Sequence, residues 1–370
     1  MTMISDRFII EPATANDSDE ILGILEETVF PSGMSLVYTR RPDAYRSFMA
    51  EAEDVHLFVC RDKQANQIAG MAAYGFHDCF IDGRPQKVVY LFGLRTRPQY
   101  RGHRAFVLLP QAYHETVQQL HARGISYFFT ATLKDNTIAR RFLTRHRPRM
   151  PSCQLLCPYL TLGFRTLTRP PSLPGSCLFR KATSDDRTTI EEFLTREGRR
   201  YSFFPARIDS LIEQHAELSW DSFYLLADRH HGDILACGAE WDQTGYKQYI
   251  VMGYRGIMKL VRNLSFLFPF FGYPSFPKPP STLRFSFLSF WCVKDNQPEY
   301  LKWFFGGFAY ATRRYPYFVA GIAETHPLRP SLDRRRMLRR DSHIYMVGDH
   351  TTPSDLERRR ESPYLECGWL

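Results

Sequence analysis

The chain repeats a pattern of its own sequence, and this repeat constrains the fold more than any other feature. The stretch PATANDSDEILGIL begins at Pro12, and KATSDDRTTIEEFL begins at Lys181. Each follows a short apolar run and continues with the apolar spacing of an amphipathic helix. A second pair of stretches, starting at His56 and Phe223, places β-rich runs on both sides of a polar turn, which is typical of a hairpin. We therefore expect two copies of one strand-and-helix unit.

The segment between the copies indicates where the chain divides. Residues 168–175, TRPPSLPG, contain three prolines and one glycine, and such a segment continues neither a strand nor a helix. We predict a first domain at 1–167, a linker at 168–175, and a second domain at 176–350 with an insertion at 243–280. Residues 351–370 are expected to form a polar, loosely held tail.

Both copies predict the same order of elements. A strand is followed by helical segments, three strands, a long helix, a strand, and further elements. In the first copy the long helix is expected at 102–123, where Gly124 fits the left-handed position after a helix end. Pro110 falls inside this helix and costs about 3 kcal/mol unless the helix kinks there. The fold class is therefore α+β, with a mixed sheet in two tandem domains.

Composition supports a globular protein with a basic surface. Of the 370 residues, 44% are apolar and 15% aromatic, and the net charge is +9. This balance excludes wholesale disorder and favours anionic partners such as a phosphorylated cofactor, a nucleic acid or a membrane surface. An ordinary basic surface is the alternative. The sequence contains no nucleic-acid reading module, so we do not expect a nucleic-acid partner.

The cysteines and the N-terminus indicate the cellular compartment of the protein. Most of the eight cysteines lie in apolar, strand-like runs, and only Cys153 and Cys157 lie close together. No histidine–cysteine set completes a zinc site, so no metal is expected. Reduced thiols and the absence of a visible signal peptide or apolar spanning segment predict a cytoplasmic protein.

An arginine cluster follows one of the predicted strands. The stretch VVYLFGLRTRPQYRGHRAFVLL starts at Val88 and passes from an apolar run into a helix through a turn that contains Gly102. Free backbone N–H groups at a helix start favour an anion, and glycine permits a close approach. Guanidinium groups add charge-assisted bonds to phosphate oxygens. We predict a pyrophosphate site, the alternative being an exposed helix start with solvated arginines. Four arginines lie within ten residues here: Arg95, Arg97, Arg101 and Arg104.

This stretch and its surroundings resemble the GNAT acetyltransferase superfamily. The pattern P-x-Y-R-G spans Pro98 to Gly102, and the downstream pattern N-x-x-A is formed by Asn136 and Ala139. The resemblance implies a GNAT-like fold in both halves, with the motif only in the first. It implies acetyl-coenzyme A, or another acyl-coenzyme A, as co-substrate. The positions it implies for the coenzyme are Leu94, Thr96, Arg101, Gly102, His103, Arg104, Ala105 and Asn136.

The sequence departs from the family pattern at positions that bear on catalysis. The two later loop glycines of the family would fall at Arg104 and Phe106, and the tyrosine that many members use as general acid would fall at Leu143. The carboxylates often found on the preceding strand are replaced by Phe92 and Gly93. Coenzyme binding is therefore better supported than any catalytic residue.

Few residues are candidates for accepting the amine proton. Each can equally be interpreted as a structural or surface residue. A water molecule can also relay a proton without a dedicated base. The candidates are Tyr90, Asp78 with its neighbour His77, and Glu240 with the nearby Asp242.

The second copy lacks the arginine–glycine turn. The corresponding stretch, KDNQPEYLKWFF from Lys294, carries an acidic residue near the helix start. We expect the second domain to bind no coenzyme and to shape the acceptor pocket instead.

The insertion contains an amphipathic stretch. Ile257, Leu260, Val261 and Leu264 form an apolar stripe, and Arg255, Lys259 and Arg262 lie off it. This pattern favours a helix at a bilayer surface or lining an acyl groove, so residues 256–272 are a candidate membrane or lipid contact. The alternative is a helix packed on its own domain.

Together these features predict a cytoplasmic acyltransferase that moves an acetyl group from acetyl-coenzyme A to the amine of a small molecule or peptide. One alternative is a longer-chain acyl or aminoacyl transferase on the same scaffold. Another is a catalytically inactive protein that binds coenzyme A or a related ligand. The sequence does not predict the oligomeric state.

Overall fold

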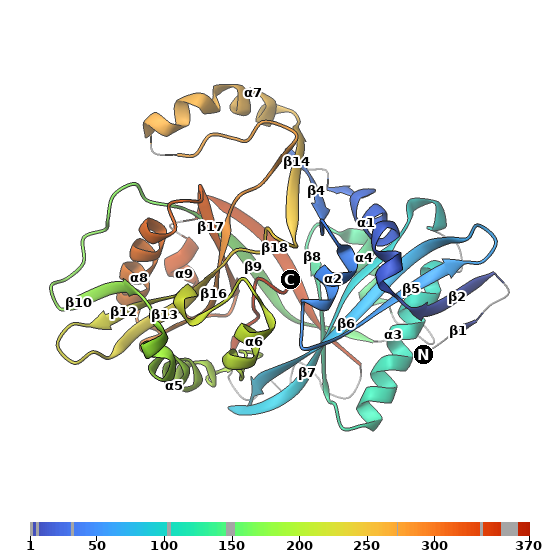
Figure 1. Cartoon of the computed structure of the whole chain (residues 1–370), viewed down its shortest axis with the longest axis horizontal. Coiled ribbons are helices and arrows are strands. Elements are labelled where there is room, and N and C mark those ends of the chain that lie inside the picture. The colour runs from blue at the N-terminus through green and yellow to red at the C-terminus, as the bar shows by residue number, and fades with distance from the viewer. Residues whose placement is uncertain are drawn as a thin grey trace.

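A computed structural model describes residues 3–4, 7–30, 33–101, 105–145, 152–271, 273–333, 336–348 and 362–370. Within these residues thirteen strands form one mixed sheet that runs through the molecule (Figure 1). Their spatial order is β1 (Met3–Ile4), β2 (Phe8–Pro12), β5 (Asp54–Asp62), β6 (Gln67–Ile81), β7 (Arg84–Thr96), β8 (Tyr127–Leu133), β18 (Leu338–Val347), β9 (Cys153–Arg165), β17 (Tyr317–Ala323), β16 (Ser286–Val293), β13 (Ile234–Trp241), β12 (Phe223–Asp228) and β10 (Cys177–Lys181).

The sheet confirms the predicted tandem α+β fold and shows how the copies join. Strands β2, β5, β6, β7 and β8 of the first copy mirror β10, β12, β13, β16 and β17 of the second. In each copy the last two of these strands are parallel. The final strands are exchanged, because β18 pairs with β8 of the first copy and β9 pairs with β17 of the second. The two halves therefore share one continuous sheet.

Helices flank the sheet. The repeated motif forms the same helix start twice, since Thr14 bonds to Asp17 before α1 and Thr183 bonds to Asp186 before α5. Such a capping box satisfies backbone groups that the first turn leaves open. The described helices are α1 (Ser18–Glu26), α2 (Ala44–Met49), α3 (Ala105–Ala122), α4 (Thr137–Thr144), α5 (Arg187–Gly198), α6 (Ile208–Gln214), α7 (Ile257–Leu264), α8 (Pro298–Ala311) and α9 (Arg329–Asp333).

The long helix α3 forms as expected within the described residues. It contains Pro110 in its interior, and Gly124 follows its end with a φ of +90°, a left-handed conformation that favours glycine. Its buried residues Leu109, Ala112 and Val117 pack in one cluster with side chains of β2, β6 and β7. Packing of this face keeps the helix in place despite the proline.

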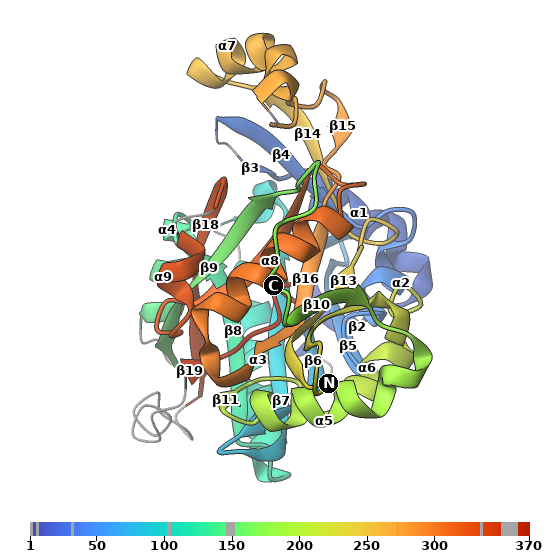
Figure 2. The ribbon, with the colours of Figure 1, turned by 90° about the vertical axis from the view of Figure 1, so that its left-hand side faces the viewer.

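The insertion is tied to the first half through a second, smaller sheet. Strand β14 (Gln248–Tyr254) of the insertion pairs antiparallel with β4 (Met34–Thr39), which the sequence analysis did not predict. The other strands of this four-stranded sheet are β3 (Val29–Phe30) and β15 (Ser281–Thr282). Beyond β14, helix α7 and a 3-10 helix, η5 (Ser265–Phe271), lie at one end of the molecule, away from the large sheet (Figures 1 and 2).

The last residues of the chain do not form the loosely held tail that the sequence predicts. Residues 351–361 of the predicted loose tail lie outside the described residues, but residues 362–370 are packed into the core. Strand β19 (Ser362–Pro363) pairs in parallel with β11 (Tyr201–Ser202), and Leu365 and Trp369 are buried. The apolar and aromatic side chains of this segment gain more from burial than a polar tail would.

Candidate active site

Two neighbouring parallel strands of the first half diverge. Strands β7 and β8 pair from Val88 opposite Tyr127 to Leu91 opposite Thr130. The Thr130 hydroxyl donates to the Leu91 carbonyl oxygen at 2.8 Å. Beyond this point β7 continues for residues 92–96 without pairing to β8, while its other edge still pairs with β6. One backbone edge of residues 92–96 therefore faces the region in which β7 and β8 separate.

A β-bulge lies in the same stretch of β7. Phe92 pairs with Ala73 and Arg95 pairs with Met71, so two residues of β7 oppose one residue of β6. Gly93 lies in this bulge with a φ of +66°, and a Cβ atom there would come 2.9 Å from Phe48 Cε1. Bulges re-aim side chains and occur next to active sites.

Helix α3 is anchored to the bulge by Tyr113. Its hydroxyl lies 2.5 Å from the carbonyl oxygen of Phe92 and accepts from the amide of Ala73 at 3.0 Å. Tyr113 is buried. The helix that follows the arginine loop is thus held directly against the irregular part of β7.

The base of the arginine loop is held by ion pairs and hydrogen bonds. Arg97 pairs with Glu27 of the segment after α1 and donates from Nε to the Ile68 carbonyl oxygen at 2.8 Å. The buried Tyr100 donates to Asp62 at 3.0 Å. The side-chain bonds from Arg7 and, to a smaller extent, from Tyr100 lower the pKa of Asp62. Arg97 therefore has a structural role, whereas Arg101, the next residue of the motif after Tyr100, is exposed.

The structure brings several of the predicted coenzyme positions together. Leu94 is 38% exposed in the bulge, Thr96 pairs with Gly70 at the end of β7, and Ala105 begins α3. Together with Arg101 they lie on one continuous segment that leads from the bulge to α3. The central residues of the predicted motif, Gly102, His103 and Arg104, lie outside the described residues.

Asn136 has a local structural role. Its side chain caps α4, because its Oδ1 atom accepts from the Ala139 amide at 3.1 Å. The N-x-x-A spacing is therefore the spacing of a helix cap. Asn136 follows β8, the second of the diverging strands, and is exposed. A role toward a ligand stays a prediction.

Tyr90 lies in an aromatic stack. Its ring packs between Phe92, with ring centroids 5.1 Å apart, and Phe129, with centroids 4.7 Å apart. Only 6% of the residue is exposed, and burial raises its pKa. The phenol is therefore held protonated, which favours a proton donor over a proton acceptor.

The other two candidate bases lie in different surroundings. Asp78 of β6 pairs with Lys87 at 3.3 Å. Glu240 of β13, in the second half, pairs with Arg314 at 2.7 Å, and burial raises its pKa. The structure therefore does not bring Tyr90, Asp78 and Glu240 into one constellation, and their catalytic roles stay predictions.

A buried charged cluster between the halves was missed by the sequence analysis. Glu51 forms ion pairs with Arg40 and, at 2.8 Å, with Lys247. All three residues are less than a tenth exposed. The Lys247 ammonium also donates to the Gly368 carbonyl oxygen at 2.7 Å. We call Arg40, Glu51 and Lys247 the Glu51 cluster. No sequence signal links these positions, because Lys247 lies in the insertion and Glu51 follows α2.

The Glu51 cluster lies next to the bulge. The Arg40 guanidinium carbon is 4.0 Å from the centre of the Phe48 ring, and Phe48 is the side chain that closes on Gly93. Tyr38, 5.5 Å from Arg40, also lies 5.8 Å from the guanidinium of Arg95 on β7. One layer of aromatic rings thus separates the charged cluster from the irregular stretch of β7.

The second half contains an equivalent divergence, and it is filled. Strands β16 and β17 pair only as far as Leu288 opposite Ala320. A register shift places Phe290 and Trp291 of β16 opposite Gly238 of β13. Phe290 has a φ of +52°, like Gly93 in the first half. Residues 288–293 are all buried, whereas residues 93–96 are partly or largely exposed.

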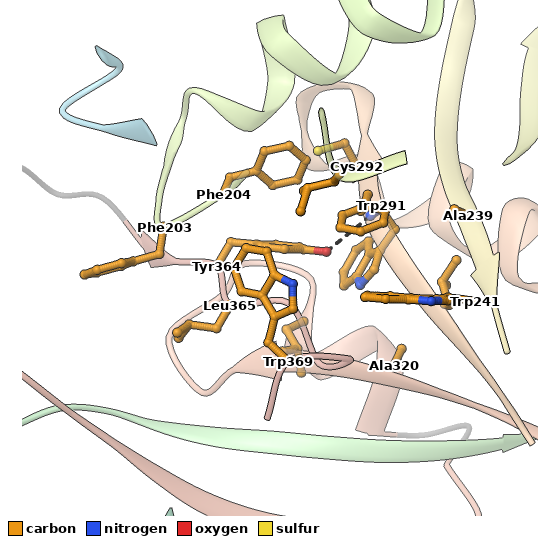
Figure 3. Close-up of a cluster of buried hydrophobic side chains, with 14 of the residues drawn as sticks. Phe203, Phe204, Ala239, Trp241, Trp291, Cys292, Ala320, Tyr364, Leu365 and Trp369 are labelled. Carbon is orange, nitrogen blue, oxygen red and sulfur yellow. Dashed lines mark hydrogen bonds between the residues drawn. The ribbon is translucent and has the colours of Figure 1, made fainter. Parts of the chain in front are cut away.

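The segment 362–370 fills this second opening. Figure 3 shows Tyr364 and Leu365 enclosed by side chains of the second half and by Trp369. The fully buried Glu366 accepts from the amide of Phe290 at 2.8 Å, and the Trp291 amide donates to the Tyr364 hydroxyl at 3.3 Å. Residues 362–370 therefore cover the strand separation of the second half, whereas the equivalent separation in the first half stays accessible.

Comparison with known proteins places this geometry in a family. Residues 22–147, which span the bulge, the arginine loop and α4, match the model of the acetyltransferase (GNAT) family. Over these residues the chain is similar to the GNAT family. The match confirms the resemblance inferred from the P-x-Y-R-G motif. No curated protein sequence matches the chain significantly.

Solved structures show the same fold over nearly the whole chain. Yeast (Saccharomyces cerevisiae) N-myristoyltransferase with bound myristoyl-CoA has 11% identity and a TM-score of 0.60, covering 98% of this chain and 90% of its own. A GCN5-related N-acetyltransferase from Sphaerobacter thermophilus has 13% identity and a TM-score of 0.59, covering 95% of this chain and 100% of its own. A probable N-acyltransferase from Enterococcus faecalis V583 has 7% identity and a TM-score of 0.52, covering 92% and 72%. At these identities the likeness concerns the fold.

The charges beside the bulge of the first half are predominantly positive. Arg40 and Lys247 share one carboxylate, Glu51, and Arg95 lies on the other side of the Tyr38 ring. Burial lowers the pKa of Lys247 to about 8 and lowers the pKa of Arg95 as well. Such a low-dielectric positive site stabilises negative charge that forms during a reaction, or a carboxylate of a bound molecule.

Proposed function

We propose that this protein is an acyl-coenzyme A-dependent N-acyltransferase whose donor site lies in the first half. The observation that carries the proposal is the difference between the two divergent strand pairs: residues 93–96 stay accessible, and residues 288–293 are buried under the chain's own segment. The accessible pair leads into the arginine loop and lies within the GNAT match. Arg101 and the motif residues after it would bind the coenzyme pyrophosphate.

The reaction proposed for this site is the transfer of an acyl group to an amine. The amine nitrogen forms a bond to the thioester carbonyl carbon, negative charge develops on the carbonyl oxygen, and the carbon–sulfur bond then breaks. The amine proton passes to a water molecule or a side chain, and the coenzyme leaves as a thiol. The positive charge of the Glu51 cluster and Arg95 would stabilise the oxyanion, and the aligned strands would hold the reactants in place.

Acetyl-coenzyme A is the default donor, and a small molecule or peptide supplies the amine. A longer acyl chain is the second candidate, favoured by the likeness to a yeast N-myristoyltransferase over 98% of this chain. That enzyme was crystallised with myristoyl-CoA.

Donor binding is tested first, with matched variants in the two halves. Arg101→Glu reverses a charge in the first-half loop, and Lys294→Glu reverses a charge just after the equivalent strand β16. Acetyl-coenzyme A should raise the melting temperature of the wild type and of Lys294→Glu. Arg101→Glu should lose at least about tenfold in affinity, because it removes charge-assisted bonds. Equal binding by Arg101→Glu and the wild type would contradict the proposed donor site.

Transfer is tested next by release of free thiol from acetyl-, octanoyl- and myristoyl-coenzyme A with a panel of small and peptidic amines. Fastest release from the acetyl donor supports the default function, and fastest release from the myristoyl donor supports the long-chain alternative. Donor binding without thiol release for any amine would contradict the enzymatic function and indicate a catalytically inactive coenzyme-binding protein.

A further inference from the structure

One end of the molecule exposes a concentration of apolar side chains. Ile257 is 76% exposed and Phe270 is 83% exposed, at the end of the molecule where α7 projects from the body (Figures 1 and 2). We call this group the apolar tip. Its members are Met252, Ile257, Leu260, Leu264, Phe266, Leu267, Phe270 and Tyr273.

The orientation of α7 is opposite to that of an ordinary surface helix. Ile257, Leu260 and Leu264 follow one another at helical spacing on one face, and all three are exposed. Val261 beside them is half-buried. The opposite side is turned to the protein, where a Cβ atom on Gly33 would come 2.7 Å from Met258 Cγ. The structure therefore excludes the alternative that the apolar stripe packs on its own domain. Several large apolar side chains exposed on one helix and the segment after it indicate an interaction site.

The charge around the tip points to the partner. The 52 residues from 243 to 294 contain no aspartate or glutamate, although the whole chain has 39 acidic residues. Arg255, Lys259 and Lys278 are exposed around the tip, and Arg262 is half-buried. Apolar and aromatic side chains in a segment that carries cations and no acidic residue are typical of segments that bind anionic lipid surfaces.

A second copy of the chain fits the tip less well. In a two-fold dimer the same patch meets itself, so Arg255 and Lys259 would face their own counterparts with no acidic residue in the segment to offset them. No described helix is long and apolar enough to cross a membrane. A contact at the membrane surface is the arrangement that satisfies both the apolar face and the surrounding charge.

We propose that residues 252–273 dock the protein on an anionic lipid bilayer. The apolar tip enters the boundary between head groups and acyl chains, and Arg255, Lys259 and Lys278 bind lipid phosphates. Strand β14 leads from Lys247 of the Glu51 cluster to the tip over seven residues, which corresponds to about 23 Å. Docking thus holds that cluster near the bilayer. Bilayer docking does not depend on the proposed acyltransferase function.

The test is co-sedimentation of the full-length protein with phosphatidylcholine vesicles, with and without phosphatidylserine. The wild type should bind the phosphatidylserine vesicles at low salt and be released as salt is raised. The double variant Leu260→Glu/Phe270→Glu should bind at least about tenfold more weakly, because both side chains lose apolar burial. Ile138→Glu, at a residue 66% exposed on α4, is the matched control and should bind like the wild type.

A second variant tests the charges separately. Arg255→Glu/Lys259→Glu should weaken binding to phosphatidylserine vesicles by at least about fivefold per cation and leave binding to pure phosphatidylcholine unchanged. The proposal is overturned if the wild type stays in solution with anionic vesicles at low salt, or if Ile138→Glu weakens binding as much as the double variant. It is also overturned if the wild type sediments as a dimer without binding vesicles and Leu260→Glu/Phe270→Glu is monomeric.

Discussion

The two halves of the molecule form the same strand divergence and use it differently. In the first half β7 and β8 separate after Leu91, next to a bulge that contains Gly93. In the second half β16 and β17 separate after Leu288, next to a bulge that contains Phe290. The first opening leads to an arginine loop and stays accessible. The second is occupied by residues 362–370 of the same chain.

This difference shows how a duplicated fold can divide its tasks. A bulge and a diverging strand pair expose backbone groups that need partners. In the second half the chain itself supplies them, because Glu366 accepts from the amide of Phe290 and the Tyr364 hydroxyl accepts from the amide of Trp291. In the first half a ligand would supply them. The second half can therefore be rigid and serve as a support, while the first half has the accessible strand pair to which the proposed donor site is assigned.

Removing the carboxylate in the second opening should have the largest effect on stability. Glu366→Ala leaves two buried amides, those of Phe290 and Gly368, without an acceptor and creates a cavity, so the free energy of unfolding should fall by about 4 kcal/mol. Urea unfolding measures the change. Glu324→Ala, at a half-exposed carboxylate after β17, is the control and should change the stability by less than about 0.5 kcal/mol. A loss as small as that of the control would mean that the segment is not an integral part of the second half.

The same segment should loosen in acid. His77 of β6 stacks on Trp369 with ring centroids 4.0 Å apart, and burial lowers its pKa from 6.5 to about 3. Because the folded protein favours neutral His77, its contribution to stability is present above pH 6.5 and is lost as the pH falls toward the folded pKa. His77→Phe keeps an aromatic ring without a charge.

The His77→Phe variant should therefore lose less stability than the wild type between pH 6.5 and pH 4, by on the order of 3 kcal/mol. Melting temperatures across this range measure the difference. His56→Phe, at a histidine whose side chain is 42% exposed, should follow the wild type. Parallel pH profiles for His77→Phe and the wild type would show that His77 is not held neutral.

The smallest effect is expected at the first bulge. Gly93→Ala places a Cβ atom against Phe48 in a left-handed conformation and should cost about 1–2 kcal/mol. It should also weaken acyl-coenzyme A binding, because the bulge shifts. Phe290 adopts a similar φ in the second half, where full burial of its ring offsets the strain. Gly175→Ala, in open space, is the control, and an effect no larger than this control would show that the bulge tolerates a side chain.

The sequence predicts the repeated architecture because the repeat is a local signal. Thr14 and Thr183 cap their helices through residues three positions away, and the hairpins follow from alternating apolar runs. The sequence also predicts the amphipathic α7, although only the structure shows that its apolar face is exposed. The arginine loop is predicted as a cluster, but the separate roles of its arginines depend on partners elsewhere, such as Glu27 for Arg97.

Contacts between distant segments explain what the sequence could not predict. The pairing of β14 with β4 joins the insertion to the first half, and the Glu51 cluster depends on that pairing. The filling of the second opening depends on residues that follow β16 by some seventy positions, as in the bond from Phe290 to Glu366. Local sequence periodicity does not predict against which of the two similar strand pairs residues 362–370 will pack.

Hydrogen exchange with and without acyl-coenzyme A tests the difference between the halves most directly. The coenzyme should slow amide exchange in residues 92–101 and leave residues 288–293 of the second half unchanged, since those residues are already buried and the Phe290 amide is bonded to Glu366. Protection that appears in 288–293 instead, or equally in both segments, would contradict the account in which only the first strand pair receives the donor.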